Sequence, residues 1–198
     1  SQGSKTRDAD FIEHMFVASN HNYLLLFTEQ GRCFWLRVYE IPEASKVAAG
    51  RVIQNIINLP QDDRVKAYIP IQDLNDEEFI KNNYIMFCTR QGTIKKTLVQ
   101  DFSRPRSNGI NAITIHEGDM LLEARLTNGN NEIIIANRKG RAIRFNESKV
   151  RSMGRNAAGV RGMTLVGPND GVVGMVCVDP NDMLVTIFVV SEGGNGKR

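Results

Sequence analysis

A short pattern recurs along this sequence at intervals of 48 to 61 residues. Each copy holds a short apolar run, a polar turn that ends in glycine, and then an alternation of basic and apolar residues. The run is typical of a strand buried on both faces, and the alternation is typical of a strand with one solvated face. Glycine supplies the positive φ that a tight hairpin turn needs. The pattern therefore predicts a β-hairpin at each turn glycine, namely Gly31, Gly92, Gly140 and Gly194.

A second glycine follows the first three turn glycines after 19, 17 and 19 residues, at Gly50, Gly109 and Gly159. An apolar alternation comes next, over residues 52–59, 110–115 and 160–165. A turn that contains aspartate then precedes a closing strand in each unit. The turns hold Asp62-Asp63, Asp119 and Asp170, and the closing strands are predicted over residues 65–71, 120–126 and 172–178.

About four predicted strands per unit, repeated at this length, indicate an all-β fold of propeller-like blades. The competing interpretation is a β-sandwich whose internal similarity is accidental. Helix signals are few. Residues 43–49 and 75–81 each predict a helical turn, and the second segment has the position of an insertion between the first two units.

Composition places the chain among folded globular proteins. It has 198 residues, of which 41% are hydrophobic and 24% charged, enough for a real core. The longest apolar stretch, 183–190 with Thr186 inside it, is far shorter than the roughly 20 residues of a membrane span, and residues 1–7 lack the apolar core of a signal peptide. The cysteines Cys33, Cys88 and Cys177 lie far apart in apolar stretches. We therefore expect buried thiols, a cytoplasmic location and no membrane partner.

Charge follows the repeat, although the net charge is only +3. Residues 31–51 hold four basic and two acidic residues, residues 90–109 five and one, and residues 138–161 eight and one. The intervening halves, 52–89, 110–137 and 162–192, are predominantly acidic. In a radial array, corresponding halves occupy corresponding positions, so the pattern predicts a positive belt along one rim. Such a belt suits a bent polyanion, and duplex DNA is the obvious one.

The expected mode of binding is contact with the DNA backbone plus bending, because no zinc-finger spacing, RNA-binding aromatic motif or recognition helix is present. A set of solvated strand faces is the competing interpretation. On an alternating strand, Lys95 and Lys96 point to opposite faces, so we do not expect both to contact DNA equally. The candidate DNA-binding residues are Arg32, Arg37, Lys46, Arg51, Lys95, Lys96, Arg104, Arg106, Arg138, Lys139, Arg141, Arg144, Lys149, Arg151, Arg155, Arg161, Lys197 and Arg198.

No constellation of residues predicts catalysis, a metal site or a cofactor. The histidines His14, His21 and His116 are scattered, without partners of the kind that metal sites or catalytic triads need. The acidic residues of 73–78 are typical of a solvated loop, and the glycine-rich stretch 193–197 lacks the pattern of a phosphate-binding loop.

Several of these segments resemble the C-terminal domain of the DNA gyrase A protein. Residues 11–21 and 31–44, with Val-Tyr-Glu-Ile-Pro-Glu at 38–43, resemble its opening blade, and residues 92–97 resemble its second. Residues 150–162, which end in Gly-Val-Arg-Gly, resemble its third blade, and residues 195–198 the turn of its fourth. The resemblance covers nearly the whole chain in order. It implies a β-pinwheel, a propeller-like disc with DNA wrapped around a basic perimeter.

The resemblance also implies the setting of the domain. The expected partners are double-stranded DNA and the gyrase A and gyrase B subunits of an A2B2 type II topoisomerase, an isomerase that introduces negative supercoils. ATP and Mg²⁺ are expected to act in other domains of that enzyme, so this domain is expected to hold no cofactor and to be no enzyme by itself. The alternatives are the C-terminal DNA-binding domain of topoisomerase IV and a protein-interaction propeller.

The chain departs from the family pattern at both ends. Only Gln2-Gly3 corresponds to the tail of the basic, glycine-rich gyrase-A box that precedes the first blade, and Gln2 stands where the box has a basic residue. We therefore expect residues 1–10 to be a tail at the end of the box and residues 11–198 to form an incomplete β-pinwheel. Its blades are predicted over about residues 11–76, 77–129, 130–180 and, in part, 181–198.

Overall fold

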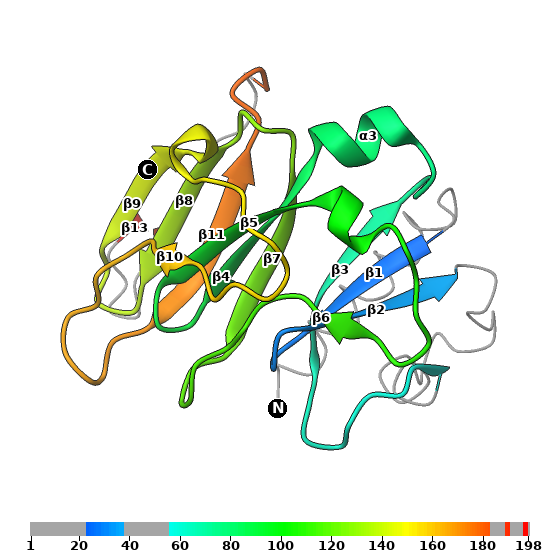
Figure 1. The fold of residues 1–198 in the computed structure, drawn as a ribbon. Helices are drawn as coiled ribbons and strands as arrows, with labels where there is room; N and C mark the ends of the chain where they lie inside the picture. Colours follow the sequence, from blue (N-terminus) through cyan, green and yellow to red (C-terminus); the bar gives the residue numbers. More distant parts are fainter. Residues whose placement is uncertain (1–22, 38–55, 183–188, 191–195, 198) are drawn as a thin grey trace.

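The computed structural model describes residues 23–37, 56–182, 189–190 and 196–197. Three antiparallel hairpins lie at the first three turn glycines, as predicted (Figure 1). They pair β1 (Tyr23–Thr28) with β2 (Arg32–Arg37), β4 (Tyr84–Thr89) with β5 (Thr93–Leu98), and β8 (Glu132–Asn137) with β9 (Ala142–Asn146). The closing strands β3 (Val65–Ile71), β7 (Leu121–Thr127) and β11 (Val172–Val178) pair antiparallel with β1, β4 and β8.

The short strand after each second glycine joins the sheet of the preceding unit. Strand β6 (Ile110–Asn111) pairs with β2, and β10 (Val160–Arg161) pairs with β5. The first two sheets therefore have the orders β3-β1-β2-β6 and β7-β4-β5-β10, and the third has the order β11-β8-β9. The outermost strand of each of the first two sheets therefore comes from the following unit. A self-contained repeat would instead supply all four strands of its own sheet.

Two turn devices recur in the three units. In the first, an aspartate of the second turn accepts the backbone N–H of a hairpin-turn residue. Asp63 Oδ1 accepts from Gln30, Asp119 Oδ1 from Gln91, and Asp170 Oδ1 from Lys139, over 3.0, 3.0 and 3.3 Å. In the second, the last residue of the first hairpin strand, Thr28, Thr89 or Asn137, accepts from the residue after the turn glycine.

The closing strands form the inner side of the array. Strand β3 contacts β7, and β7 contacts β11. Between the first two sheets, Phe27 packs edge-on against Phe87 and Phe102 with ring centroids 5.1 and 5.4 Å away. Between the second and third sheets, a second apolar cluster includes Met86 and Ile135. The outer strands β2, β6, β5, β10 and β9 therefore face away from the inner side.

Several sequence predictions can be compared with the described residues. The helical turn expected over 75–81 is the helix α3, Glu77–Asn82, capped by Asp76. The segment 43–49 and most of the alternation at 52–59 lie outside the described residues, and 56–58 form a helical turn instead of a strand. Strands β12 (Val189–Val190) and β13 (Gly196–Lys197) pair antiparallel on either side of the fourth turn glycine.

Among the described residues, no helix has the length and apolar character to cross a membrane.

Candidate nucleic-acid interface

The outer edge of the array carries most of the basic residues. We call this edge the rim and define it as strands β2, β5, β6, β9 and β10, the hairpin turn 138–141, and the connecting segments 103–109 and 147–159. It contains exposed and half-buried cations from all three units. The exposed ones are Arg37, Arg104, Arg106, Arg138, Lys139, Arg141, Arg144, Lys149, Arg151 and Arg161, and the half-buried ones are Arg32 and Arg155.

The two half-buried arginines are held by carbonyl oxygens of the strand-exchange segments. Arg32 Nη2 donates to the Asn108 carbonyl at 2.9 Å, and Arg155 Nη1 donates to the Asn111 carbonyl at 3.2 Å. Each guanidinium has five N–H donors. One hydrogen bond to a carbonyl therefore orients the group and leaves the other donors to bind an anion.

Arg144 of β9 is more exposed. Its Nε lies 3.3 Å from Glu132 Oε2, while 69% of its side chain remains accessible. Such an exposed pair contributes little stability, and the guanidinium stays available to a competing phosphate.

The prediction that Lys95 contacts DNA is wrong. Its side chain is 0% exposed. The Nζ donates to the carbonyls of Ala112 at 2.6 Å, Gly154 at 2.9 Å, Arg155 at 3.0 Å and Ala157 at 3.2 Å. The ammonium therefore joins three chain segments inside the protein. Burial lowers its pKa to about 8, an effect that the nearby Asp101 carboxylate opposes.

The prediction for Lys96 is wrong for a related reason. Only 6% of this residue is exposed. Its Nζ donates to the Glu147 carbonyl at 3.0 Å, lies 3.7 Å from Glu147 Oε1, and sits 4.6 Å from the centre of the Tyr84 ring. Glu147 is itself buried and accepts from Thr127 and Asn131. The pair ties the second sheet to the start of the connecting segment 147–159.

The two lysines do point to opposite faces of β5, as strand alternation requires, but both faces are covered. Trp35 occupies the position in β2 that Lys96 occupies in β5, and its indole N–H likewise donates to a carbonyl of the next unit, that of Phe102 at 2.9 Å. Of the remaining candidates, Lys46, Arg51 and Arg198 lie outside the described residues. Lys197 belongs to β13, whose side chains also lie outside them.

The basic residues away from the rim are largely paired with acids. Lys66 of β3 lies 3.3 Å from Glu29, and Arg125 of β7 lies 3.2 Å from Glu123. Lys81 of α3 pairs with Glu77. Among the described residues, three cations outside the rim thus have a carboxylate partner, and most of the basic residues lie on the rim.

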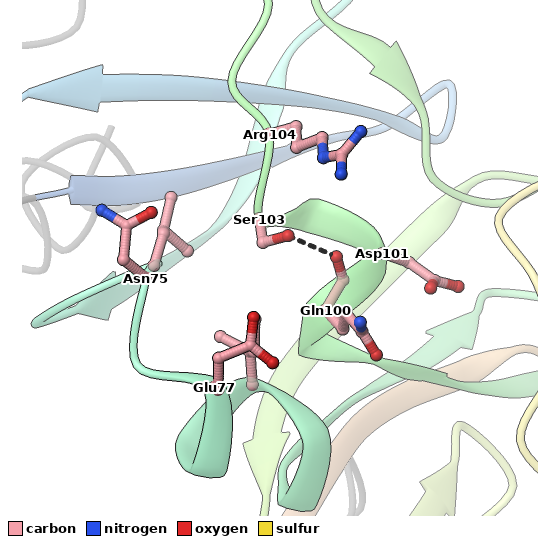
Figure 2. A pocket seen from close by; sticks show the side chains of 8 residues that line it. Asn75, Glu77, Gln100, Asp101, Ser103 and Arg104 are labelled. Atoms are coloured by element: carbon pink, nitrogen blue, oxygen red, sulfur yellow. Dashed lines mark hydrogen bonds between the residues drawn. The ribbon is translucent and has the colours of Figure 1, made fainter.

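A pocket of about 570 Å³ lies between α3 and the 3-10 turn Val99–Phe102 (Figure 2). Glu77, Asp101 and Arg104 line it, and the Ser103 hydroxyl donates to the Gln100 carbonyl at 2.7 Å. Removal from water raises the pKa of Asp101, which Arg155 and Lys95 partly offset. The acidic residues expected to form a solvated loop have local structural roles, because Asp73 accepts from the Asn75 amide and Asp76 caps α3.

No group of three or more His, Cys, Asp or Glu in the described part of the chain is arranged to hold a metal ion. His116 is exposed on a turn, while His14, His21 and the glycine-rich stretch 193–197 are outside or mostly outside that part. Cys33 and Cys88 are buried and Cys177 is half-buried. Burial raises the pKa of the Cys88 and Cys177 thiols to about 12, so neither is a ready nucleophile.

Repeated hairpin blades, exchanged outer strands and a basic rim define a β-propeller-like domain of the pinwheel type. The chain belongs to the family described as "DNA gyrase C-terminal domain, beta-propeller", whose model matches residues 22–72, 83–128 and 131–179. Each matched stretch contains one hairpin and its closing strand. The fold class predicted from the repeat is thereby confirmed.

Relatives and solved structures agree with this assignment. The DNA gyrase A protein of Haemophilus influenzae is 41% identical over 167 residues, which are 84% of this chain and 18% of that protein. The crystal structure of the C-terminal domain of DNA topoisomerase IV superimposes with a TM-score of 0.70 at 32% identity, covering 82% of this chain and 49% of that one. The DNA gyrase A C-terminal domain gives 0.68 at 26% identity, covering 89% and 54%. The chain spans about a fifth of the length of the curated relatives it matches.

Proposed function

We propose that this chain binds duplex DNA without reading its sequence and bends and wraps it along the rim. The observation that carries the proposal is the position of the exposed cations, which lie along the rim in all three described blades, on β2, β9 and β10, in the turn 138–141 and in the connecting segments 103–109 and 147–159. Arginine predominates among them, and its guanidinium donates two parallel bonds to a phosphate. A curved row of such groups favours a bent duplex because the bend brings more phosphates into contact.

We further propose that the wrapping serves a larger enzyme. The curated relatives are named as the A protein of DNA gyrase. In this proposal the domain presents a crossed DNA segment to the catalytic core of a cytoplasmic A2B2 type II topoisomerase, associated with the nucleoid. That enzyme would then introduce negative supercoils by ATP-dependent strand passage. ATP, Mg²⁺ and the DNA-cleaving residue would belong to other domains.

A salt titration of DNA binding tests the proposal. With a fluorescent duplex of about 100 bp, the logarithm of the affinity should fall linearly with the logarithm of the salt concentration, by about 0.9 per phosphate contacted. The triple variant Arg141→Ala, Arg144→Ala and Arg155→Ala should bind more weakly with a shallower slope, and should shift the topology of ligated circles less.

The matched control is the triple variant Lys66→Ala, Lys81→Ala and Arg125→Ala, which removes the same charge from outside the rim. It should bind nearly as tightly as the wild-type chain. If the two triple variants lost the same affinity for duplex DNA, net charge alone would explain binding. That result would overturn the assignment of DNA binding to the rim.

The second candidate is the DNA-bending role of topoisomerase IV, which the structural similarity to that enzyme's C-terminal domain favours. The whole enzyme distinguishes the two, because gyrase introduces negative supercoils whereas topoisomerase IV relaxes DNA. A protein-interaction propeller would instead bind an acidic protein along the rim and would show negligible affinity for duplex DNA.

A further inference from the structure

The turn 154–157 has three of its carbonyl groups directed at one buried cation. The Lys95 Nζ donates to the carbonyls of Gly154, Arg155 and Ala157. The remaining carbonyl, that of Asn156, accepts from the Thr114 hydroxyl at 2.7 Å. Every carbonyl of this turn is therefore bonded to the body of the protein.

The backbone conformation of the turn follows from two observations. The Ala157 N–H donates to the Gly154 carbonyl, which closes a four-residue turn. None of the described residues other than glycine has a positive φ, so Arg155 and Asn156 both have negative values. A hydrogen-bonded turn with negative φ at both central positions is of type I.

Peptide planarity then fixes where the amide groups point. In a trans peptide, the carbonyl of one residue and the N–H of the next point in opposite directions. Because the Gly154 and Arg155 carbonyls point to the buried lysine, the N–H groups of Arg155 and Asn156 point away from it. Gly154 and Asn156 are exposed, whereas Lys95 is 0% exposed, so the side of the turn opposite to Lys95 faces solvent.

We propose that the turn 154–157 is a binding site for one phosphate group of the DNA backbone, held by the outward N–H groups of Arg155 and Asn156. Successive backbone N–H groups of a turn that point to the same side form an anion-binding concavity. The connecting segment 147–159 also carries the exposed Arg151 and Arg155 itself, and the exposed Arg161 follows in β10. Burial raises the pKa of the Asp101 carboxylate, whereas Arg155 and Lys95 both act to lower it, which places two cations and one anion near the turn. Lys95 is a positioning residue that holds the amides outward and does not touch the DNA.

This site rests on the proposed DNA-binding function and refines it. A pair of substitutions at Arg155 in the full chain separates the backbone contact from the side-chain contact. Arg155→Ala removes the guanidinium and keeps the N–H, whereas Arg155→Pro removes both. Proline suits this position, since its φ is that of the first central residue of a type I turn.

Both variants should lower the salt slope of DNA binding by about 0.9, because each loses one cation. Arg155→Pro should bind about threefold to tenfold more weakly than Arg155→Ala at every salt concentration, because it also loses a hydrogen bond to a charged acceptor. Equal affinities of two folded variants would overturn the site.

Titration of the wild-type chain with inorganic phosphate gives a test that needs no variant. Amide resonances of Arg155 and Asn156 should shift with phosphate and not with chloride at equal ionic strength. Absence of that shift would overturn the site, even if Arg155→Pro does not fold. The outcome is separable from the proposed function. If the chain fails to bind duplex DNA but these amides still respond to inorganic phosphate, the DNA-binding function fails and the turn stands as an anion site for a free phosphate.

Discussion

Lys95 and Lys96 differ from the other basic residues of the rim in where their charges lie. Four backbone carbonyls enclose the Lys95 ammonium, three of them from the following unit, whereas one carbonyl, the Glu147 carboxylate and the Tyr84 ring surround the Lys96 ammonium. A buried cation is tolerated only when its hydrogen bonds are satisfied. At the corresponding positions of the first unit, Phe34 buries an apolar ring that needs no hydrogen bond, and Trp35 satisfies its indole N–H by donating to a carbonyl. The position is therefore a contact between units, and its chemistry varies from one unit to the next.

Replacing Lys95 by methionine should destabilise the fold. The Lys95→Met variant leaves four carbonyls without their shared donor, and we expect a loss of about 3 kcal/mol in the free energy of unfolding. Urea unfolding measures it. The exposed Lys81→Met should change stability by less than about 0.5 kcal/mol. A Lys95→Met variant as stable as wild type would contradict the carbonyl cage.

The stability that depends on Lys95 should vary with pH. Burial lowers its pKa to about 8 in the folded chain, against 10.5 for an ordinary lysine. Between these values the unfolded chain binds more protons at this site, so its contribution to stability rises with pH and is lost as the pH falls through 8. The gap in unfolding free energy between wild type and Lys95→Met should widen by up to about 1.4 kcal/mol per pH unit in that window. Urea titrations at pH 7.5, 8.5 and 9.5 would refute this if the gap narrowed.

The exchanged strands β6 and β10 depend on the second glycine of each unit. Gly159 has φ +102°, and a Cβ there would lie 2.2 Å from the Ile94 carbonyl oxygen. Gly109 has φ +71° and meets the Phe34 ring in the same way. A glycine at this position lets the incoming strand approach the outer hairpin strand closely enough to pair with it.

Gly159→Ala should therefore disrupt the pairing of β10 with β5. We expect a loss of about 2 kcal/mol or more in unfolding free energy, from backbone strain and steric overlap. Gly154→Ala is the matched control, because no atom lies within 4 Å of the position of its Cβ. It should stay within about 0.5 kcal/mol of wild type. Hydrogen exchange should locate the damage, with faster exchange in β5 for Gly159→Ala, and unchanged β5 protection would argue against the strand exchange.

The three blades are connected by more than their linking segments. Strand exchange, the Lys95 cage and the Lys96–Glu147 pair each join elements of different units. Apolar clusters fill both interfaces between neighbouring sheets. A substitution that destabilises one blade should therefore lower the stability of the other blades as well. In a chain of independent modules, only the substituted blade would lose stability.

Ile135→Ala in the third sheet tests this coupling. Ile135 is 0% exposed, and its truncation should cost about 2–5 kcal/mol. The only tryptophan of the chain, Trp35, lies in the first sheet. Its fluorescence transition should shift to lower urea together with the far-UV circular dichroism. Independent blades would instead leave the fluorescence transition where it is.

The amino-acid sequence by itself determined the repeat, the three hairpins with their turn glycines, and the bounds of β3 and β11. These features depend on local periodicity and on conformations that few residues other than glycine adopt. Only the tertiary structure decided that β6 and β10 join the preceding sheet and that Lys95 and Lys96 are internal. A two-residue strand carries no signal for its partner, and the alternation of side chains says which face a residue occupies but not what covers that face. The covering segments come from 17 to 62 residues away along the chain, so neither lysine could be assigned its role until those segments were in place.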